Sequence, residues 1–269
     1  RSGAALPAHG VERLSTADLL AEPCCGPYRA DVTEDRFYFR QLLAGADFAE
    51  TDMVAQQMVN FSYLIGDRST GECVVVDPAY GVAELKAIAE ADGMRLTGML
   101  VTHYHPDHCG GDMMGMRIEG ASELLALESM PVHVQADEAE YVMKVTDLGE
   151  GDLVQHASGD VVSVGAIDVT LLHTPGHTPG SQCFLVEDSL VAGDTLFLQG
   201  CGRTDLPGGD PAQLYESITT RLAKVPDSAV LFPGHLYSPK PSESMGEVRR
   251  SNMVFKPRSS AEWLRMFGS

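Results

Sequence analysis

Residues 101–112 read VTHYHPDHCGGD and have the spacing H-x-H-x-D-H, which is formed by His103, His105, Asp107 and His108. These side chains cannot all face one way from a strand or a helix, because a strand alternates its side chains and a helix distributes them around a cylinder. A loop can bring these four side chains together. The apolar run LTGML before them and the paired glycines after them place the cluster where a buried strand ends. Imidazole and carboxylate ligands suit zinc or iron, so the cluster is predicted to bind metal.

Three further stretches place polar side chains directly after apolar runs. LLHTPGHTPGS contains His173 and His177, VAGDTLF contains Asp194, and LFPGHLYS contains His235. The apolar runs have the length of strands, so the side chains are predicted to lie on loops at strand ends. Together with the first cluster they supply the histidines and carboxylates that a pair of divalent metals needs when one carboxylate bridges them.

The composition limits the classes of protein to which the chain can belong. Its 269 residues are 44% hydrophobic, which is enough for a sizeable core in one large domain or a two-layer fold. Aspartate and glutamate total 38 against 19 lysine and arginine, and the net charge of -19 would repel a nucleic acid. The sequence contains no run of about 18 apolar residues, so no membrane span is predicted. The six cysteines show no disulfide pattern, which favours a reducing, cytoplasmic location.

The chain is predicted to divide into a lead-in segment over residues 1–35 and one domain over residues 36–269, which includes C-terminal surface helices. RFYFRQLL, QQMVNFSYLIGD and GECVVVDP predict an antiparallel meander, and VAELKAIAEADG predicts a helix. Residues 147–160 are acidic and predict a loop, while VVSVGAIDVTLLH, SQCFLVED and SLVAGDTLF predict three more strands. Met113, Met114 and Met116 in MMGMRIEG either pack in the protein or form a soft lid for an apolar ligand.

In this order, the motifs THYHPDH, HTPGH, GD and PGH resemble those of the metallo-β-lactamase superfamily over roughly residues 60–235. The resemblance implies an α/β fold, an αββα sandwich of two mixed sheets with outer helices, and a site at one edge between the sheets. It implies two divalent metal ions, zinc first and iron or manganese as alternatives. The implied ligands are His103, His105 and His177 for the first metal, Asp107, His108 and His235 for the second, and Asp194 as the bridge. His173 is not an implied ligand and is expected either to pack or to support the ligands from behind, and His9, His133 and His156 match no motif.

Asp194 resembles the bridging carboxylate of glyoxalase II-like thioester hydrolases, which true β-lactamases of this fold lack. The segment LFLQGCGRTDLPGGDP is similar to those hydrolases and also to persulfide dioxygenases of the same fold. Arg203 occupies the place of a glyoxalase II lysine that helps to bind glutathione, so it is expected to hold a substrate carboxylate. A salt bridge with Asp205 is the alternative. Asp205 stands where glyoxalase II has a tyrosine, which favours another thiol carrier, and Lys256 and Arg258, near Asn252, resemble terminal basic residues that contact substrate.

The resemblance implies that a metal-bridging hydroxide hydrolyses the thioester of a small thiol. Asp107 would both ligate the second metal and orient this hydroxide. The thiolate leaves without a dedicated acid, because the pKa of a thiol is only about 8.5. The alternative is a mono-iron persulfide dioxygenase that uses His103, His177 and Asp194. The long segment between His108 and His177 and the continuation LPGGDP favour hydrolysis. The expected partners are a small-molecule substrate and a second copy of the chain in a homodimer. Neither a nucleic acid nor a membrane is expected to be a partner.

Overall fold

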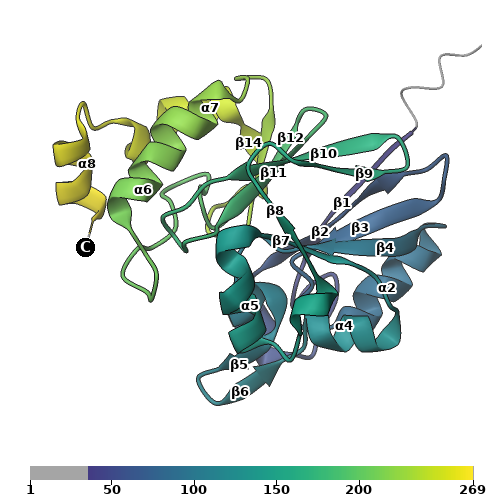
Figure 1. Cartoon of the computed structure of the whole chain (residues 1–269). Helices are drawn as coiled ribbons and strands as arrows, with labels where there is room; N and C mark the ends of the chain where they lie inside the picture. Colours follow the sequence, from purple (N-terminus) through teal and green to yellow (C-terminus); the bar gives the residue numbers. More distant parts are fainter. Residues whose placement is uncertain (1–35, 269) are drawn as a thin grey trace, which may run out of the picture. The chain divides into compact units, whose positions relative to one another are not determined.

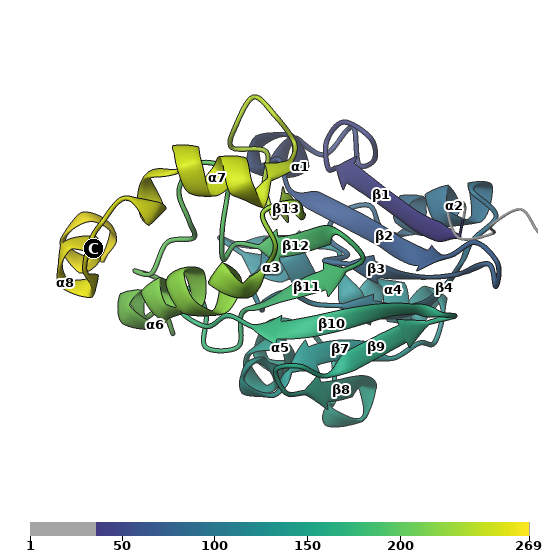
Figure 2. The same cartoon turned by 90° about the horizontal axis from the view of Figure 1, so that it is seen from above.

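The structure is a computed structural model that describes residues 36–268, so the predicted lead-in segment and His9 lie outside the described residues. Two six-stranded mixed sheets form its centre (Figures 1 and 2). The first sheet has the order β1 (Phe37–Leu43), β2 (Phe61–Asp67), β3 (Glu72–Val76), β4 (Arg95–Leu100), β7 (Val132–Gln135) and β8 (Leu153–His156). The second has the order β14 (Glu243–Ser244), β13 (Val230–Pro233), β12 (Ser189–Gly193), β11 (Gln182–Val186), β10 (Ile167–His173) and β9 (Val161–Val164).

Helices lie on the outer sides of the two sheets (Figure 1). The larger helices beside the first sheet are α2 (Val82–Ala91), α4 (Ala121–Leu127) and α5 (Ala139–Val145). Those beside the second sheet are α6 (Pro211–Glu216), α7 (Met245–Ser251) and α8 (Ser260–Phe267). The structure also contains the short helices α1 (Met53–Met58) and α3 (Pro106–Cys109) and a small hairpin of β5 (Gly111–Met113) and β6 (Met116–Ile118). The predicted α/β fold and αββα sandwich are therefore confirmed.

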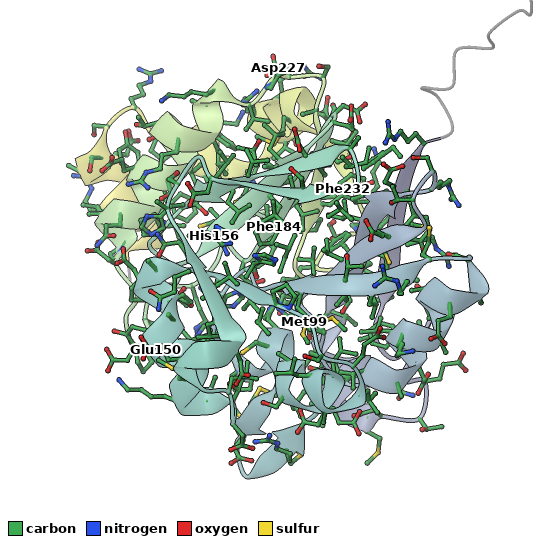
Figure 3. The ribbon with its side chains drawn as sticks, turned by 45° about the vertical axis from the view of Figure 1, so that its right-hand side comes forward. Met99, Glu150, His156, Phe184, Asp227 and Phe232 are labelled. Carbon is green, nitrogen blue, oxygen red and sulfur yellow. The ribbon has the colours of Figure 1, made fainter. Side chains whose placement is uncertain are left out.

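Three apolar layers hold these elements together. The strand β2 is buried along its whole length because both faces of its sheet are covered. Leu64 points into the layer shared with the outer helices, whereas Tyr63 and Ile65 point between the sheets, as the alternation of a strand requires. Figure 3 labels Phe184, which lies in the layer between the sheets, and Met99, which lies in the layer below the first sheet.

The second sheet begins with a four-stranded antiparallel meander, β9 to β12, and the first with an antiparallel meander, β1 to β3. The three runs predicted as strands in the second half form four, because the turn at Gly165 divides one run into β9 and β10. Residues 153–156 form β8, so the prediction of a loop there was wrong. This short strand pairs in parallel with β7, and that partner comes only from the tertiary fold.

One smaller prediction also needs correction. The run QQMVNFSYLIGD was predicted as a strand, but its first three residues end helix α1 and only Phe61–Asp67 is extended. The predicted C-terminal helices are present, and α8 lies on the surface with only the indole of Trp263 fully buried. Trp263 Nε1 donates a hydrogen bond of 3.1 Å to the backbone oxygen of Val254. Among residues 36–268, no helix is long and apolar enough to cross a bilayer.

Candidate metal centre

The segment between β4 and β5 carries four of the predicted ligands. His103 and His105 lie on irregular backbone after β4, and Asp107 and His108 lie in the short helix α3, which His105 precedes as the N-cap residue. Pro106 occupies the first turn of this helix, where its missing N–H leaves no hydrogen bond unmade. The helix ends at Gly110, whose φ of 86° and close approach to Gly120 exclude a side chain. A strand end followed by a single helical turn thus converges the four side chains, as predicted.

The remaining predicted ligands come from the second sheet. His177 follows β10, Asp194 follows β12 directly, and His235 follows β13, all at the same end of that sheet. The structure brings the seven side chains together. Donor atoms lie within 4.8 Å of one another in three groups: His103, His105 and His177; His103, His108 and Asp194; and Asp107, His108 and His235. The first and third groups correspond to the two predicted metal sites.

Asp194 lies between these two groups. Its Oδ2 is 3.7 Å from His177 Nε2 and 3.4 Å from His235 Nε2, and its Oδ1 is 3.5 Å from His108 Nε2. Gly234 allows this approach, because a Cβ there would lie 2.3 Å from Asp194 Oδ1. The position is the one that a bridging carboxylate needs.

The donor set fits bound metal. His105 Nδ1 lies 3.0 Å from His103 Nε2 and 3.1 Å from His177 Nε2, so three ring nitrogens face one point. Asp194 Oδ1 is buried and has no hydrogen-bond partner among the described residues. A buried carboxylate oxygen without a donor is unfavourable, and a cation would satisfy it. Imidazoles with carboxylates are the ligands that zinc and iron accept.

The electrostatics of the two groups differ. Burial, followed by the neighbouring histidines, lowers the pKa of His103 well below its usual value. Burial and His177 lower the pKa of His105 to about 4. Burial would also lower the pKa of His108, but Asp107, Asp194 and Asp77 outweigh it and raise that pKa to about 10. Neutral imidazoles are ready to bind a metal, whereas His108 releases a proton when a cation replaces it.

Asp77 and Asn60 belong to the site although no motif marked them. Asp77 Oδ2 lies 2.9 Å from His108 Nδ1 and accepts a 2.6 Å hydrogen bond from the hydroxyl of Thr102. This contact fixes which nitrogen of His108 faces the centre. Asn60 Nδ2 donates a 3.1 Å hydrogen bond to Asp107 Oδ2. Asp77 follows the apolar run CVVV, the same strand-end signal as the other ligands, whereas Asn60 carries no signal in the sequence.

Glu138 is a third residue that the motifs did not mark. Its side chain is buried, and its Oε1 accepts a 2.7 Å hydrogen bond from the Thr178 hydroxyl. Its Oε2 accepts a 2.6 Å hydrogen bond from the backbone N–H of Gly180. Burial raises the pKa of Glu138 to about 7, against the hydrogen bonds from Thr178, Tyr104 and Gly180, which lower it. Glu138 therefore contacts the loop that carries His177.

A cavity of about 570 Å³ opens onto the donor groups. Its lining includes Met58, His105, Pro106, Asp107, Met113, Met114, His177, Asp194, Phe197, Gln199, Cys201, Gly202, Arg203, Leu206, His235 and Tyr237. The volume is in the range of small-molecule sites.

Arg203 lies on the exposed rim of this cavity, where its Nε and Nη2 donate hydrogen bonds of 2.6 and 2.7 Å to the carboxylate of Asp205. The salt bridge that was the alternative for Arg203 is therefore present. The backbone oxygen of Arg203 also lies 2.7 Å from His177 Nδ1, so this residue orients a donor.

Lys256 and Arg258 are not among the residues that line the cavity. Lys256 Nζ donates to the backbone oxygen of Arg250, and the N–H of Arg258 donates a 2.8 Å hydrogen bond to Glu262. Their contact with substrate stays a prediction. Asn252 is buried and its Nδ2 donates a 2.9 Å hydrogen bond to the backbone oxygen of Phe197, so it supports the loop that follows Asp194.

The other histidines have structural partners. His173 Nε2 lies 2.9 Å from the backbone oxygen of Pro179 and packs, as expected, outside the donor groups. His133 Nδ1 lies 2.8 Å from His156 Nε2 on the neighbouring strand of the first sheet.

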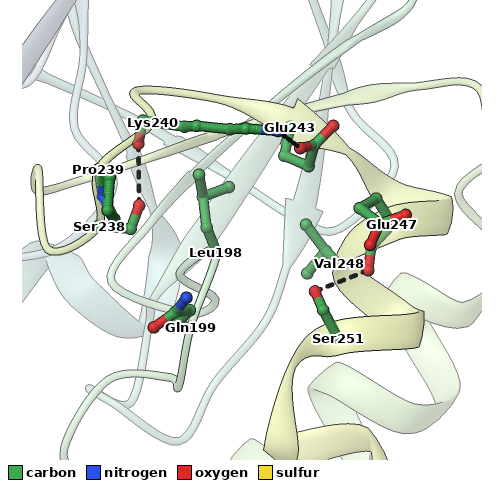
Figure 4. A pocket seen from close by; sticks show the side chains of 9 residues that line it. All are labelled: Leu198, Gln199, Ser238, Pro239, Lys240, Glu243, Glu247, Val248 and Ser251. Atoms are coloured by element: carbon green, nitrogen blue, oxygen red, sulfur yellow. Dashed lines mark hydrogen bonds and ion pairs between the residues drawn. The ribbon is translucent and has the colours of Figure 1, made fainter.

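A second, smaller cavity of about 320 Å³ adjoins the first, and Gln199 lines both. Figure 4 shows its walls, in which Lys240 forms an ion pair with Glu243 and Ser238 donates a 2.8 Å hydrogen bond to the backbone oxygen of Lys240. None of the predicted metal ligands lines it. It is therefore separate from the donor groups.

Comparison with known proteins agrees with this geometry. The family model of the metallo-beta-lactamase superfamily matches residues 56–235. The chain is 36% identical over 182 residues to the hydroxyacylglutathione hydrolase of Nitrosococcus oceani, covering 66% of this chain and 62% of that protein. It is 29% identical over 233 residues to the mitochondrial persulfide dioxygenase ETHE1 of Homo sapiens, covering 84% of this chain and 83% of that protein. The crystal structure of ETHE1 from Myxococcus xanthus superposes with a TM-score of 0.71 at 29% identity, over 86% of this chain and 90% of that one.

Proposed function

Because the chain belongs to the metallo-β-lactamase superfamily, we propose that it is a metal-dependent hydrolase that cleaves thioesters of a small thiol. The observation that carries the proposal is the third donor group. Asp107, His108 and His235 converge beside His103, His105 and His177, which is the set that two metal ions require. The similarity to a hydroxyacylglutathione hydrolase supports the same reaction class.

When bound, two divalent metals would lower the pKa of water to about 7 and polarise the thioester carbonyl. Asp107 accepts a hydrogen bond from the attacking water and holds its lone pair toward the carbonyl carbon. Asn60 keeps this carboxylate in place through the 3.1 Å hydrogen bond to Asp107 Oδ2. The tetrahedral intermediate then expels a thiolate, and no general acid is needed because the pKa of a thiol is about 8.5.

Arg203 binds an anionic group of the thiol carrier in the same proposal. Its guanidinium is held bidentately by Asp205 and is exposed at the rim, so a substrate carboxylate exchanges with Asp205 for the same fork of donors. The smaller cavity, which Gln199 also lines, offers space near this rim for the rest of a polar carrier.

A mono-iron persulfide dioxygenase is the second candidate function. It is favoured by coverage, since the match to the human persulfide dioxygenase spans 83% of that protein and the match to the hydroxyacylglutathione hydrolase spans 62% of its own. His103, His177 and Asp194 would then form the two-histidine, one-carboxylate ligand set of a non-haem iron site.

Metal content and two activities distinguish these functions. We would measure metals by mass spectrometry on protein purified without chelator, hydrolysis of acyl thioesters by release of thiol, and oxygen uptake with glutathione persulfide. Two metal ions per chain with thiol release and no oxygen uptake support the hydrolase. One iron per chain with rapid oxygen uptake contradicts it.

Two histidine variants add a matched test. His235→Ala removes a donor of the third group only, and His177→Ala removes a donor of the first group, which both functions need. A hydrolase that uses both groups loses activity in both variants. A dioxygenase that uses the first group with Asp194 keeps oxygen uptake in His235→Ala and loses it in His177→Ala.

A further inference from the structure

The lining of the larger cavity includes several apolar side chains besides the donor groups. They come from four separate segments: Met58 at the end of α1, Met113 and Met114 on the β5–β6 hairpin, Phe197 and Leu206 after β12, and Tyr237 after β13. An apolar collar around a polar metal floor is typical of a site that binds a ligand with one reactive polar group and one apolar arm.

The aromatic side of this collar is ordered against the donor group. The ring of Tyr237 stacks on His235 with ring centroids 4.6 Å apart and an angle of 7° between the planes. Phe197 meets the edge of Tyr237 at 5.2 Å. The backbone oxygen of Met58 lies 2.7 Å from His235 Nδ1, so Met58 is fixed beside the same histidine. This side is therefore preformed before any ligand binds.

The methionine side is anchored at its base and exposed at its tip. A Cβ on Gly111 would lie 2.2 Å from the backbone oxygen of Val145, so the hairpin packs tightly against the end of α5. At the tip, Met114 has 95% of its surface exposed although it lines the cavity. In Figure 1 the hairpin projects from the sandwich beyond α5.

An exposed methionine at a cavity mouth has apolar surface that binding would remove from water. Its unbranched thioether side chain adapts to irregular apolar shapes. Arg203 and Gln199 are polar side chains that line the same cavity from the segment after β12, whereas the β5–β6 hairpin contributes only Met113 and Met114 to its lining. A polar thiol carrier suits Arg203 and Gln199, and the methionines of the hairpin are left for the acyl group.

We infer that the substrate carries an apolar acyl arm of several methylene groups, and that Met113 and Met114 determine specificity for it. This inference rests on the proposed thioester hydrolysis. The arm leaves the carbonyl at the metal floor and packs between the methionine hairpin and the Phe197–Tyr237 wall. A short, hydroxylated acyl group would leave this collar in water.

The first experiment measures kcat/KM for N-acetylcysteamine thioesters from acetyl to octanoyl. The value should rise by up to about fourfold for each added methylene until the collar is filled. The double variant Met113→Gln, Met114→Gln keeps the side-chain length and should flatten this rise, so that kcat/KM for octanoyl and acetyl thioesters becomes similar. Met116→Gln is the control, because Met116 lies on the same hairpin but does not line the cavity.

The second experiment uses S-alkyl thioethers of N-acetylcysteamine, which cannot be hydrolysed, and measures their binding to the metal-loaded protein by calorimetry. Affinity that rises with alkyl length and is lost in the double variant supports the apolar subsite even if no thioester is cleaved, in which case only the proposed function fails. Hydrolysis and binding that are both independent of chain length overturn the inference and leave the thioesterase proposal intact. A length dependence unchanged in the double variant also overturns the role of the two methionines.

Discussion

The backbone N–H of Tyr104 donates a 2.7 Å hydrogen bond to Oε1 of Glu138, which lies 34 positions further along the chain. Tyr104 sits between His103 and His105, and the same carboxylate also binds Thr178 and Gly180 in the His177 loop. One buried carboxylate therefore joins the two loops that carry the first donor group. Charge-assisted hydrogen bonds of this kind are about twice as strong as neutral ones.

Glu138→Gln should weaken metal binding at the first donor group and lower the stability of the metal-free protein by about 2 kcal/mol. The glutamine must point its NH₂ group at a donor from which the carboxylate of Glu138 accepted a hydrogen bond, so at least one hydrogen bond is lost. Metal affinity measured by competition with a chromogenic chelator, together with urea unfolding, checks both effects. Glu140→Gln is the control, since Glu140 is exposed on α5 and pairs only with Lys144 among the described residues. Equal chelator competition in both variants would contradict the role of Glu138.

Asp77→Asn should reduce metal affinity by about 10- to 100-fold with little change in the fold. The asparagine has a single acceptor oxygen, so it cannot accept the hydrogen bond from His108 Nδ1 together with both hydrogen bonds from Thr102. The His108 ring is then no longer held in one tautomer. Metal content after dialysis against a weak chelator measures this loss. Full metal content with wild-type activity would show that His108 does not depend on Asp77.

Asp107→Asn should lower kcat by about 100-fold or more while KM for a thioester changes much less. The asparagine keeps the size of the side chain and one oxygen, but it no longer offers a carboxylate to the attacking water. Steady-state kinetics with zinc-loaded protein of known metal content separates this effect from metal loss. Retained full activity would refute the role of Asp107.

Arg203→Ala should raise KM for thioesters of an anionic thiol carrier by about tenfold and leave kcat nearly unchanged, because the guanidinium binds the carrier and not the reacting carbonyl. Arg203→Lys should restore only part of the affinity, since an ammonium cannot form the bidentate contact. The matched control is an uncharged N-acetylcysteamine thioester, for which the variants should behave like the wild type. An equal KM increase for both carriers would point to a structural effect on His177, which the backbone of Arg203 contacts.

Asp67→Asn should destabilise the metal-free protein at pH 7 by about 2 kcal/mol, and the difference from the wild type should begin to shrink below about pH 4 and disappear only as the pH falls through the lowered folded-state pKa. The Arg36 guanidinium, with Ser69 and Ala166 N–H, holds the pKa of Asp67 well below its usual range, against burial. The unfolded chain then binds the proton first, so the stabilisation is complete above roughly pH 4 and is lost as pH falls. Urea unfolding at several pH values measures this, and a constant difference across the range would contradict it.

The sequence by itself determined the donor set and the class of fold. Each ligand follows a strand-length apolar run, and the two periodicities of strand and helix are local properties of the chain, so their order predicted two packed sheets with outer helices. His103, His105, Asp107 and His108 were recognisable because their spacing lies within one segment. The separation of the donors into two groups came from resemblance, and the observed groups agree with it.

Only the tertiary structure decided how distant segments meet. The strand β8 exists because β7 lies beside it, and no local pattern in residues 153–156 states that partner. Asn60 and Asp77 contact the donors, and Glu138 contacts the loops that carry them, across 31 to 48 positions of sequence. These hydrogen bonds satisfy buried polar atoms but follow no spacing rule. The salt bridge of Arg203 and the place of Lys256 away from the cavity likewise depend on side-chain packing. Local backbone preferences are written in neighbouring residues, whereas long-range contacts depend on which surfaces the folded chain buries together.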